Sequence, residues 1–340
     1  MVFRAEGLKD LVEQACGLEP IRVAVVDAAQ GLVIETIREA HALGIVEPRL
    51  IGVPEAIDDA CRSVGFEPRD EWIVPARSDP EAAAMAVHLV RTGAADAVMK
   101  GNIHTDALMH ALLGKRTGLR VPGRRVSHVF VTEVPNHAKL LGITDAAINI
   151  APDLGAKAQI LQNAVDLYHL LGVAKPKVAV ISAVETVNPE IASTLDAACL
   201  ALMARRGQIT GALVDGPLAF DNAISRIAAE EKGIDSEVAG DADIVLVPGL
   251  DSGNILAKNL GYLAGAVAAG LVTGLARPVV LSSRADPPVG RLSALAIASL
   301  MHHRAPTAIS ETSERREPSF LCAPQSEEAC CPIGARLDAL

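Results

Sequence analysis

Polar residues interrupt the apolar stretch "VVLSSRADPPVGRLSALAIAS" at residues 279–299. The stretch begins with the pattern of a buried strand and ends with that of a helix, and Ser283, Arg284 and Asp286 lie between the two. A guanidinium group binds a phosphate or carboxylate group through two parallel hydrogen bonds, and the start of a helix offers further N–H donors. This order of residue types predicts an anion-binding loop at the end of a strand.

A second polar strand end is the segment "MKGNIHTDALMHALL" at residues 99–113. Thr105 is expected to cap the helix that follows, and the N–H groups of the first turn would favour an anion beside His104. The alternative is that Thr105 and Asp106 act only as caps and that His104 is a half-exposed side chain.

The segment "GRRVSHVFVTEVP" places Arg124 and Arg125 directly before a predicted strand, which Ser127 and His128 continue. Paired arginines suit phosphate groups because each guanidinium forms two hydrogen bonds in a fixed geometry. The alternative is a solvated basic turn with no ligand.

The segment "GLDSGNILAKNL" follows the strand pattern 243–249 and opens a helix. Asn254 and Lys258 lie one turn apart on the same face of that helix, near the end of the strand. A helix start with a nearby lysine favours an anion. The alternative is a Gly-Asn turn with a surface lysine and no ligand.

Composition and motifs exclude several classes of protein. The formal net charge is −10 and only 2% of the residues are aromatic, which argues against binding to nucleic acid or to an anionic membrane. The sequence lacks G-x-G-x-x-G, G-x-x-x-x-G-K-[ST], G-x-S-x-G and H-E-x-x-H. Neither glycine-loop nucleotide binding nor elbow-serine hydrolysis is therefore expected.

Cysteine usage and the N-terminal stretch bear on the compartment. The cysteines, at positions 16, 61, 199, 322, 330 and 331, form no C-x-x-C pair, and the first residues show no secretory signal. Reduced thiols and a cytoplasmic protein are expected. The uncharged run at 259–276 reaches only the lower length limit of a membrane helix, so we expect a buried helix that ends near Gly270.

Strand patterns alternate with helical patterns along most of the chain. The strand patterns cover 21–28, 49–53, 72–74, 96–101, 126–134, 146–151, 177–183, 211–216, 243–249 and 278–283. The helical patterns cover 30–43, 54–63, 79–92, 105–113, 155–171, 189–205, 221–232, 253–269 and 290–302. This alternation predicts mostly parallel sheet with helices on both faces.

Four long segments resemble the short form of the phosphate acetyl/butyryltransferase family. They are "NIAPDLGAKAQILQNAVDLYHLLGVAKPKVAVISAVETVNP", "GALVDGPLAFDNAIS", "VAGDADIVLVPGLDSGNILAKNLGYLAGAVAAG" and "PVVLSSRAD". The resemblance implies the reaction acyl-CoA + phosphate = acyl phosphate + coenzyme A, with acetyl-CoA or butyryl-CoA as acyl donor. It also implies that no metal or redox cofactor takes part and that the protein is a homodimer.

The resemblance further implies an α/β fold of two α/β/α sandwich lobes with a cleft between them, like that of the isocitrate and isopropylmalate dehydrogenases. The first lobe would comprise residues 1–119 and 272–304, and the second residues 120–271. Residues 305–340, rich in Ser, Glu and Pro, are expected to form a flexible tail.

Carried onto this chain, the family's active-site Ser-Arg pair corresponds to Ser283 and Arg284, and its cleft-lining "GNI…K" segment to Asn254 and Lys258. Two positions depart from the longer acetyltransferases. Gly290 stands where they have an aspartate, and Met109 stands in a segment where they have an arginine. The group that deprotonates the coenzyme A thiol is therefore unassigned.

Two other functions remain open at this point. A metal- and NAD-dependent decarboxylating dehydrogenase would share the fold, and its metal would need converging carboxylates such as Asp215, Asp243 and Asp251. A regulatory lobe that binds a CoA ester or phosphate without turnover is the other.

Overall fold

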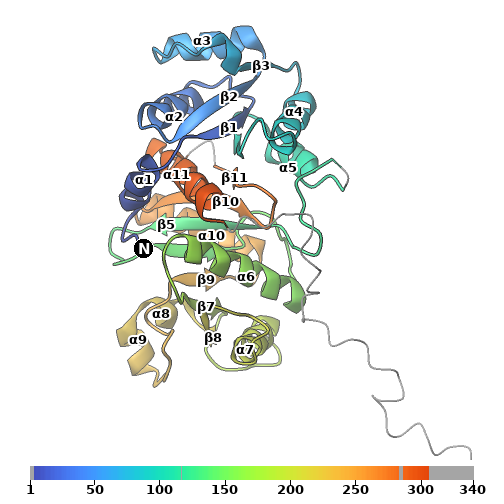
Figure 1. The fold of residues 1–340 in the computed structure, drawn as a ribbon. Coiled ribbons are helices and arrows are strands. Elements are labelled where there is room, and N and C mark those ends of the chain that lie inside the picture. Colours follow the sequence, from blue (N-terminus) through green and yellow to red (C-terminus); the bar gives the residue numbers. More distant parts are fainter. Residues whose placement is uncertain (1–3, 116, 283–285, 306–340) are drawn as a thin grey trace, which may run out of the picture.

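A single mixed sheet runs the length of the molecule. The computed structural model describes residues 4–115, 117–282 and 286–305. Its sheet has 11 strands in the order β3-β2-β1-β4-β11-β10-β5-β6-β9-β7-β8, so the first strands of the chain and β8 lie at opposite ends (Figure 1).

One half of the sheet is parallel and is built by the N-terminal part of the chain with one late strand. Its strands are β1 (Ile21–Val26), β2 (Val46–Gly52), β3 (Ile73–Pro75), β4 (Ala97–Lys100) and β11 (Val279–Val280). Because β11 pairs with β4 in parallel, the end of β11 lies beside the end of β4. The chain segments that leave β4 and β11 therefore begin side by side, although they lie far apart in the sequence.

The other half of the sheet begins with antiparallel pairs. Its strands are β5 (Ser127–Glu133), β6 (Leu141–Thr144), β7 (Lys177–Ile181), β8 (Leu213–Leu218), β9 (Ile244–Leu246) and β10 (Val267–Thr273). The pairs β10–β11, β10–β5 and β5–β6 are antiparallel, whereas β6, β9, β7 and β8 are parallel to one another. The parallel strands of the two halves consequently run in opposite directions.

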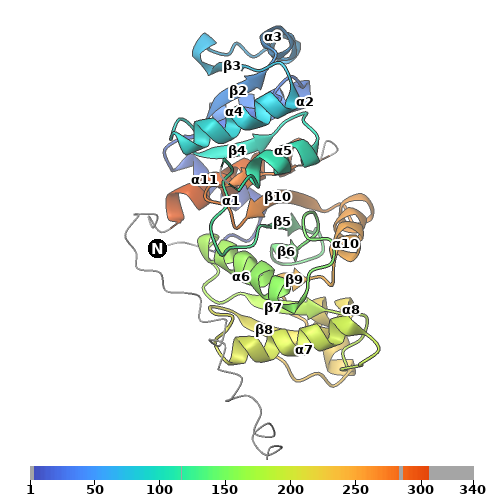
Figure 2. The ribbon, with the colours of Figure 1, turned by 90° about the vertical axis from the view of Figure 1, so that its right-hand side faces the viewer.

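Helices cover both faces of the sheet. They are α1 (Leu8–Cys16), α2 (Gly31–Ala42), α3 (Pro54–Ser63), α4 (Asp79–Arg91), α5 (Thr105–Leu112), α6 (Leu154–Leu170), α7 (Ala192–Arg205), α8 (Phe220–Ile224), α9 (Arg226–Glu231), α10 (Leu250–Leu263) and α11 (Pro288–Arg304). One face packs against α1, α2, α3, α6, α7 and α11. The other carries α4 and α5 over one half and α8, α9 and α10 over the other. Figure 2 shows α4 and α5 in front of the first half and α10 at one side of the second.

The sequence patterns were wrong in two places beside this second face. The expected strand at 146–151 is an irregular segment with bends, and β6 lies at 141–144 instead. The expected helix 253–269 ends at Leu263, and residues 267–273 form β10. Gly265, with φ +67°, ends the helix because this left-handed conformation suits glycine.

Helix α10 also differs from the expected buried helix. Gly253 is its only buried residue, and Tyr262 and Leu263 are 74% and 83% exposed. Its Leu256 and Leu260 pack against the apolar cluster under α8 and α9. The helix therefore lies on the surface with one face against the sheet.

The predicted division into lobes stays a prediction, and one continuous sheet crosses it. The tail 306–340, with three of the cysteines, lies outside the described residues. No helix within residues 4–115, 117–282 and 286–305 has the length and apolar character needed to cross a lipid bilayer.

Candidate active site

A cavity of about 780 Å³ lies on the second face of the sheet, between α5 and α10. Its floor is formed by β5 and β10, where Phe130 and Gly270 are paired across the two strands. Its polar lining consists of Lys100, His104, Thr105, His128, Asn254, Lys258, Tyr262, Ser282 and Asp286. The cavity thus lies between the ends of β4 and β11 on one side and α10 on the other.

Four of the predicted site residues meet in this cavity. His104 and Thr105 come from the start of α5, and Asn254 and Lys258 from α10. Asn254 is held in place because its side-chain amide donates to the Ala146 carbonyl at 3.3 Å. The N-cap of α5 is His104 and not Thr105, which is the first helical residue.

The predicted Ser-Arg pair, Ser283 and Arg284, lies outside the described residues. The nearest described residues on either side, Ser282 and Asp286, both line the cavity. The Asp286 carbonyl accepts a hydrogen bond from the Arg291 guanidinium, which is buried at the start of α11.

The structure does not bring the other predicted pair to the cavity. Arg124 forms an ion pair with Asp166 of α6, and the Arg125 guanidinium donates to the Asn149 side chain at 3.0 Å. These arginines lie before β5 and neither lines the cavity. Asp166 and Asn149 therefore bind the two arginines, for which a phosphate ligand was expected.

Two further residues line the cavity that the sequence did not single out as ligands. Lys100, the last residue of β4, is only 6% exposed and donates to the Gly101 carbonyl at 3.3 Å. His128 is fully buried in β5, on the same face as Phe130, with their rings 4.3 Å apart. A lysine and a histidine inside apolar strand patterns were the available signal, because polar residues are rarely buried without a role.

Burial lowers the pKa of His128 to about 4, although the Asp145 carboxylate and the Leu281 carbonyl act in the opposite direction. His128 is therefore neutral at pH 7. Among the described cavity-lining residues, two lysines stand against the single carboxylate of Asp286. A positively charged cavity in a chain of net charge −10 favours an anionic ligand.

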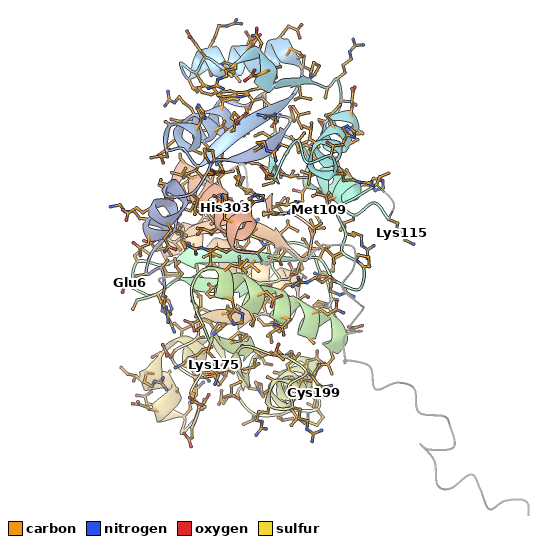
Figure 3. The ribbon with its side chains drawn as sticks, viewed as in Figure 1. Glu6, Met109, Lys115, Lys175, Cys199 and His303 are labelled. Carbon is orange, nitrogen blue, oxygen red and sulfur yellow. The ribbon has the colours of Figure 1, made fainter. Side chains whose placement is uncertain are left out.

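Met109 and Gly290, the two departures from the longer acetyltransferases, are both accounted for by packing. Met109 lies on α5, where it packs against the apolar cluster beneath α4 (Figure 3). At Gly290, an added Cβ atom would lie 2.6 Å from the Ala268 carbonyl oxygen, so α11 approaches β10 too closely for a side chain.

The carboxylates that a dehydrogenase would need do not gather. Asp243 pairs with Arg4 and Lys139, and Asp215 accepts from the adjacent Gly216 N–H. In the part of the chain that the structure describes, no group of three or more His, Cys, Asp or Glu side chains is placed to hold a metal ion.

Residues 77–298 match the family model described as "Phosphate acetyl/butaryl transferase". The chain is 52% identical over 266 residues to the phosphate acetyltransferase of Rhizobium meliloti, covering 77% of this chain and 83% of that protein. It is 41% identical over 296 residues to the phosphate butyryltransferase of Clostridium acetobutylicum, covering 87% of this chain and 98% of that protein.

The fold agrees with these relatives. The crystal structure of a branched-chain phosphotransacylase from Enterococcus faecalis V583 superposes with a TM-score of 0.71 at 30% identity, covering 83% of this chain and 99% of that chain. The protein is thus an acyltransferase with a mixed α/β fold, and the comparisons do not favour a dehydrogenase. The chain belongs to the phosphate acetyl/butyryltransferase family. The narrower likeness to isocitrate and isopropylmalate dehydrogenases stays a prediction.

Proposed function

We propose that the protein transfers an acetyl or butyryl group between coenzyme A and inorganic phosphate in the cavity between α5 and α10. The observation that carries this proposal is the set of cationic and polar side chains from β4, α5 and α10 around one cavity. Both substrates are anionic, and the net positive lining supplies the complementary charge.

The two cavity lysines differ in burial, which suggests a different partner for each. Lys258 is exposed on α10, at the mouth, whereas Lys100 is buried at the end of β4. Coenzyme A is long and carries its own phosphate groups, so only its thiol end would enter the cavity. We assign Lys258 to the phosphate groups of coenzyme A and Lys100 to the inorganic phosphate.

Ser283 and Arg284 are proposed to act on the reacting groups, by resemblance to the family. Phosphate attack on a thioester passes through an anionic tetrahedral intermediate. Arg284 would bind the phosphate through two hydrogen bonds, and Ser283 would donate to the developing oxyanion. The support from the structure is that Ser282 and Asp286, the described residues that flank this segment, line the cavity.

Binding both substrates in one cavity contributes to the rate by fixing the phosphate oxygen beside the thioester carbon. The reaction exchanges one acyl acceptor for another, and no electrons are gained or lost. Neither a resident metal nor a redox cofactor is needed for this balance.

A homodimer in the cytoplasm is also proposed, as the family resemblance and the scattered cysteines indicate. The exposed apolar side chains Ile255, Tyr262 and Leu263 on α10 support an association between copies. Sedimentation analysis of the purified protein would test this, and a monomer at micromolar concentration would contradict it.

A thiol-release assay tests the proposed activity. Acetyl-, propionyl- and butyryl-CoA are supplied with and without phosphate, and free thiol is measured. Release that depends on phosphate is expected. Arsenate should replace phosphate, because the acyl arsenate that forms hydrolyses and draws the reaction forward. Thiol release that is the same with and without phosphate, or none with any of the three esters, would contradict the proposal.

A further inference from the structure

The reaction requires that one proton change place, and no residue has so far been assigned to move it. Hydrogen phosphate attacks as a dianion that carries one proton, and the acyl phosphate that forms carries none on its phosphate group. The coenzyme A thiol is released with a proton on sulfur. A proton must therefore pass from a phosphate oxygen to the sulfur atom, and this inference rests on the proposed function.

Few of the described cavity residues can both accept and return a proton near pH 7. His104, His128, Asp286 and Tyr262 are the titratable candidates besides the two lysines, and Tyr262 is exposed on α10. His104 is exposed at the start of α5, at the cavity mouth. His128 is fully buried on the floor, formed by β5 and β10.

The His128 ring is held mainly by packing. Both ring nitrogens are buried and neither makes a hydrogen bond of ordinary length and angle within the described structure, although the Leu281 carbonyl is close enough to raise the pKa of the ring. A buried donor or acceptor left without a partner costs about 1–3 kcal/mol, so such groups are uncommon unless a ligand or water completes them. The edge of Phe130 packs against the ring from one side.

Gly270 of β10 leaves room for the ring beside the Leu281 backbone. A Cβ atom at Gly270 would lie 3.1 Å from His128 Nε2 and 2.3 Å from the Leu281 carbonyl oxygen. The imidazole thus occupies the space next to the Leu281 backbone, whose N–H donates to the Gly270 carbonyl at 3.0 Å. His128 lies beside Leu281, two residues before Ser283 in the chain.

The surrounding charges suit a ring that is neutral at rest and positively charged for a moment. Burial opposes the imidazolium, whereas the Asp145 carboxylate, buried beyond β6, favours it. Lys100, Lys258, His104, Asp286 and Tyr262 are the other titratable groups among the described residues that line the cavity. An entering phosphate dianion would favour the imidazolium further, because an opposite charge nearby raises the pKa of a histidine.

We propose that His128 is a catalytic residue that carries the proton between hydrogen phosphate and the coenzyme A sulfur. In the forward direction a neutral ring nitrogen takes the proton from the phosphate oxygen as that oxygen bonds to the acyl carbon. The carbon–sulfur bond then breaks with its electron pair on sulfur, and the imidazolium returns the proton to the thiolate. In the reverse direction the ring takes the proton from the thiol, sulfur displaces phosphate from the acyl carbon, and the imidazolium gives the proton to the departing phosphate oxygen.

The position at Gly290 offers no alternative to this assignment. An added side chain there would begin 2.6 Å from the Ala268 carbonyl oxygen, so a carboxylate does not fit without a shift of α11 or β10. Ala268 of β10 lines the same cavity, and His128 lines it from the adjacent strand β5.

The experiment compares His128→Gln with His88→Gln, a matched change at an exposed histidine on α4. General acid–base catalysis contributes about 10²–10⁴-fold, so kcat of His128→Gln should fall by at least about 100-fold in both directions. The KM values for phosphate and the CoA ester should change little, and His88→Gln should match the wild type. Melting curves confirm that both variants fold.

Chemical rescue provides the second readout, since a purely structural role would not produce it. His128→Ala leaves a space the size of the ring, and added imidazole should restore part of kcat in a saturable manner. A His128→Gln rate within about threefold of wild type, or a loss confined to KM, would overturn the proposal. So would a folded His128→Ala protein that imidazole does not rescue. Inactive wild-type protein would instead contradict the proposed function itself.

Discussion

Two groups of cations in this protein have opposite surroundings. Beside the starts of β7 and β9, Arg4, Lys139 and Lys177 meet the carboxylates of Asp241 and Asp243 at 2.6–2.9 Å. We call this group the Asp243 cluster. In the cavity, by contrast, the lysines line an open space with a single carboxylate among its described residues.

The difference separates charged side chains that join strands of the fold from charged side chains that line a cavity. Asp243 is buried and also accepts from the Lys177 backbone N–H at 2.8 Å, so it joins β9, β7 and the N-terminal segment. The cavity lysines come from β4 and α10, and their charge exceeds that of the cavity carboxylate. Changes in the first group should affect stability, and changes in the second should affect turnover.

Asp243→Ala should have the largest effect on stability. The change removes an ion-pair partner of Arg4 and Lys139 and leaves the Lys177 backbone N–H without its acceptor, and an unsatisfied buried donor costs about 1–3 kcal/mol. Denaturant unfolding should show this loss, while kcat measured on the folded fraction stays near the wild-type value. A variant as stable as the wild type would show that the cluster is not structural.

Arg284→Ala should have the largest effect on turnover. Loss of one positioned donor to the transition state costs about 2.7–4 kcal/mol of barrier, or about 10²–10³-fold in kcat. Arg284→Lys keeps the charge but not the two-pronged geometry, so much of the loss should remain. Because both the bound phosphate and the intermediate are anionic, the phosphate KM should also rise.

Ser283→Ala provides the matched comparison for Arg284. If its hydroxyl serves only the oxyanion, kcat falls while the phosphate KM changes little. The opposing hypothesis is that Arg284 only pairs with Asp286 to hold the loop. In that case Arg284→Ala lowers the melting temperature, and folded protein turns over normally.

Asp241→Asn should have the smallest effect. Burial alone would raise the pKa of Asp241. Hydrogen bonds from Lys139 and Lys177 nevertheless hold this pKa at about 2, below the ordinary value of 3.8. The carboxylate therefore contributes stability above about pH 4 that is lost as the pH falls towards 2. Since its side chain is 41% exposed, the contribution should be at most about 1 kcal/mol.

The check on Asp241 is a series of unfolding curves from pH 7 to pH 2. The wild type should lose more stability than Asp241→Asn between about pH 4 and pH 2. Parallel curves for the two proteins in that range would contradict the assignment of this carboxylate to the ion pairs.

Much of the N-terminal half followed from sequence patterns because its strands are buried on both faces and its helices end at glycines. The pattern failed at 259–276, where small apolar residues suit a helix and a strand equally. Helix α10 and strand β10 share this run, and only the pairing of β10 with β5 and β11 decides between them. Local periodicity carries no information about such long-range pairing.

The site shows the same limit. His104, Thr105, Asn254 and Lys258 could be recognised because each follows a strand and opens or lines a helix. Arg124 could not be judged from sequence, since its partner Asp166 lies on α6, far along the chain. His128 looked like one more strand residue, because the room for its ring beside the cavity depends on Gly270 in the neighbouring strand.

The central claim is that the cavity binds the CoA ester at its mouth, beside Lys258, and phosphate at the buried end of β4, beside Lys100. The most direct measurement is the pair of KM values in Lys258→Ala and Lys100→Met. Exposed Lys175→Ala, just before β7 in the lower part of the molecule, is the control (Figure 3). A lost charged hydrogen bond is worth about 1.5–3 kcal/mol, so each KM should rise at least about tenfold. Lys258→Ala should raise the acyl-CoA KM and Lys100→Met the phosphate KM, with Lys175→Ala unchanged. Folded variants whose two KM values match those of Lys175→Ala would contradict the account.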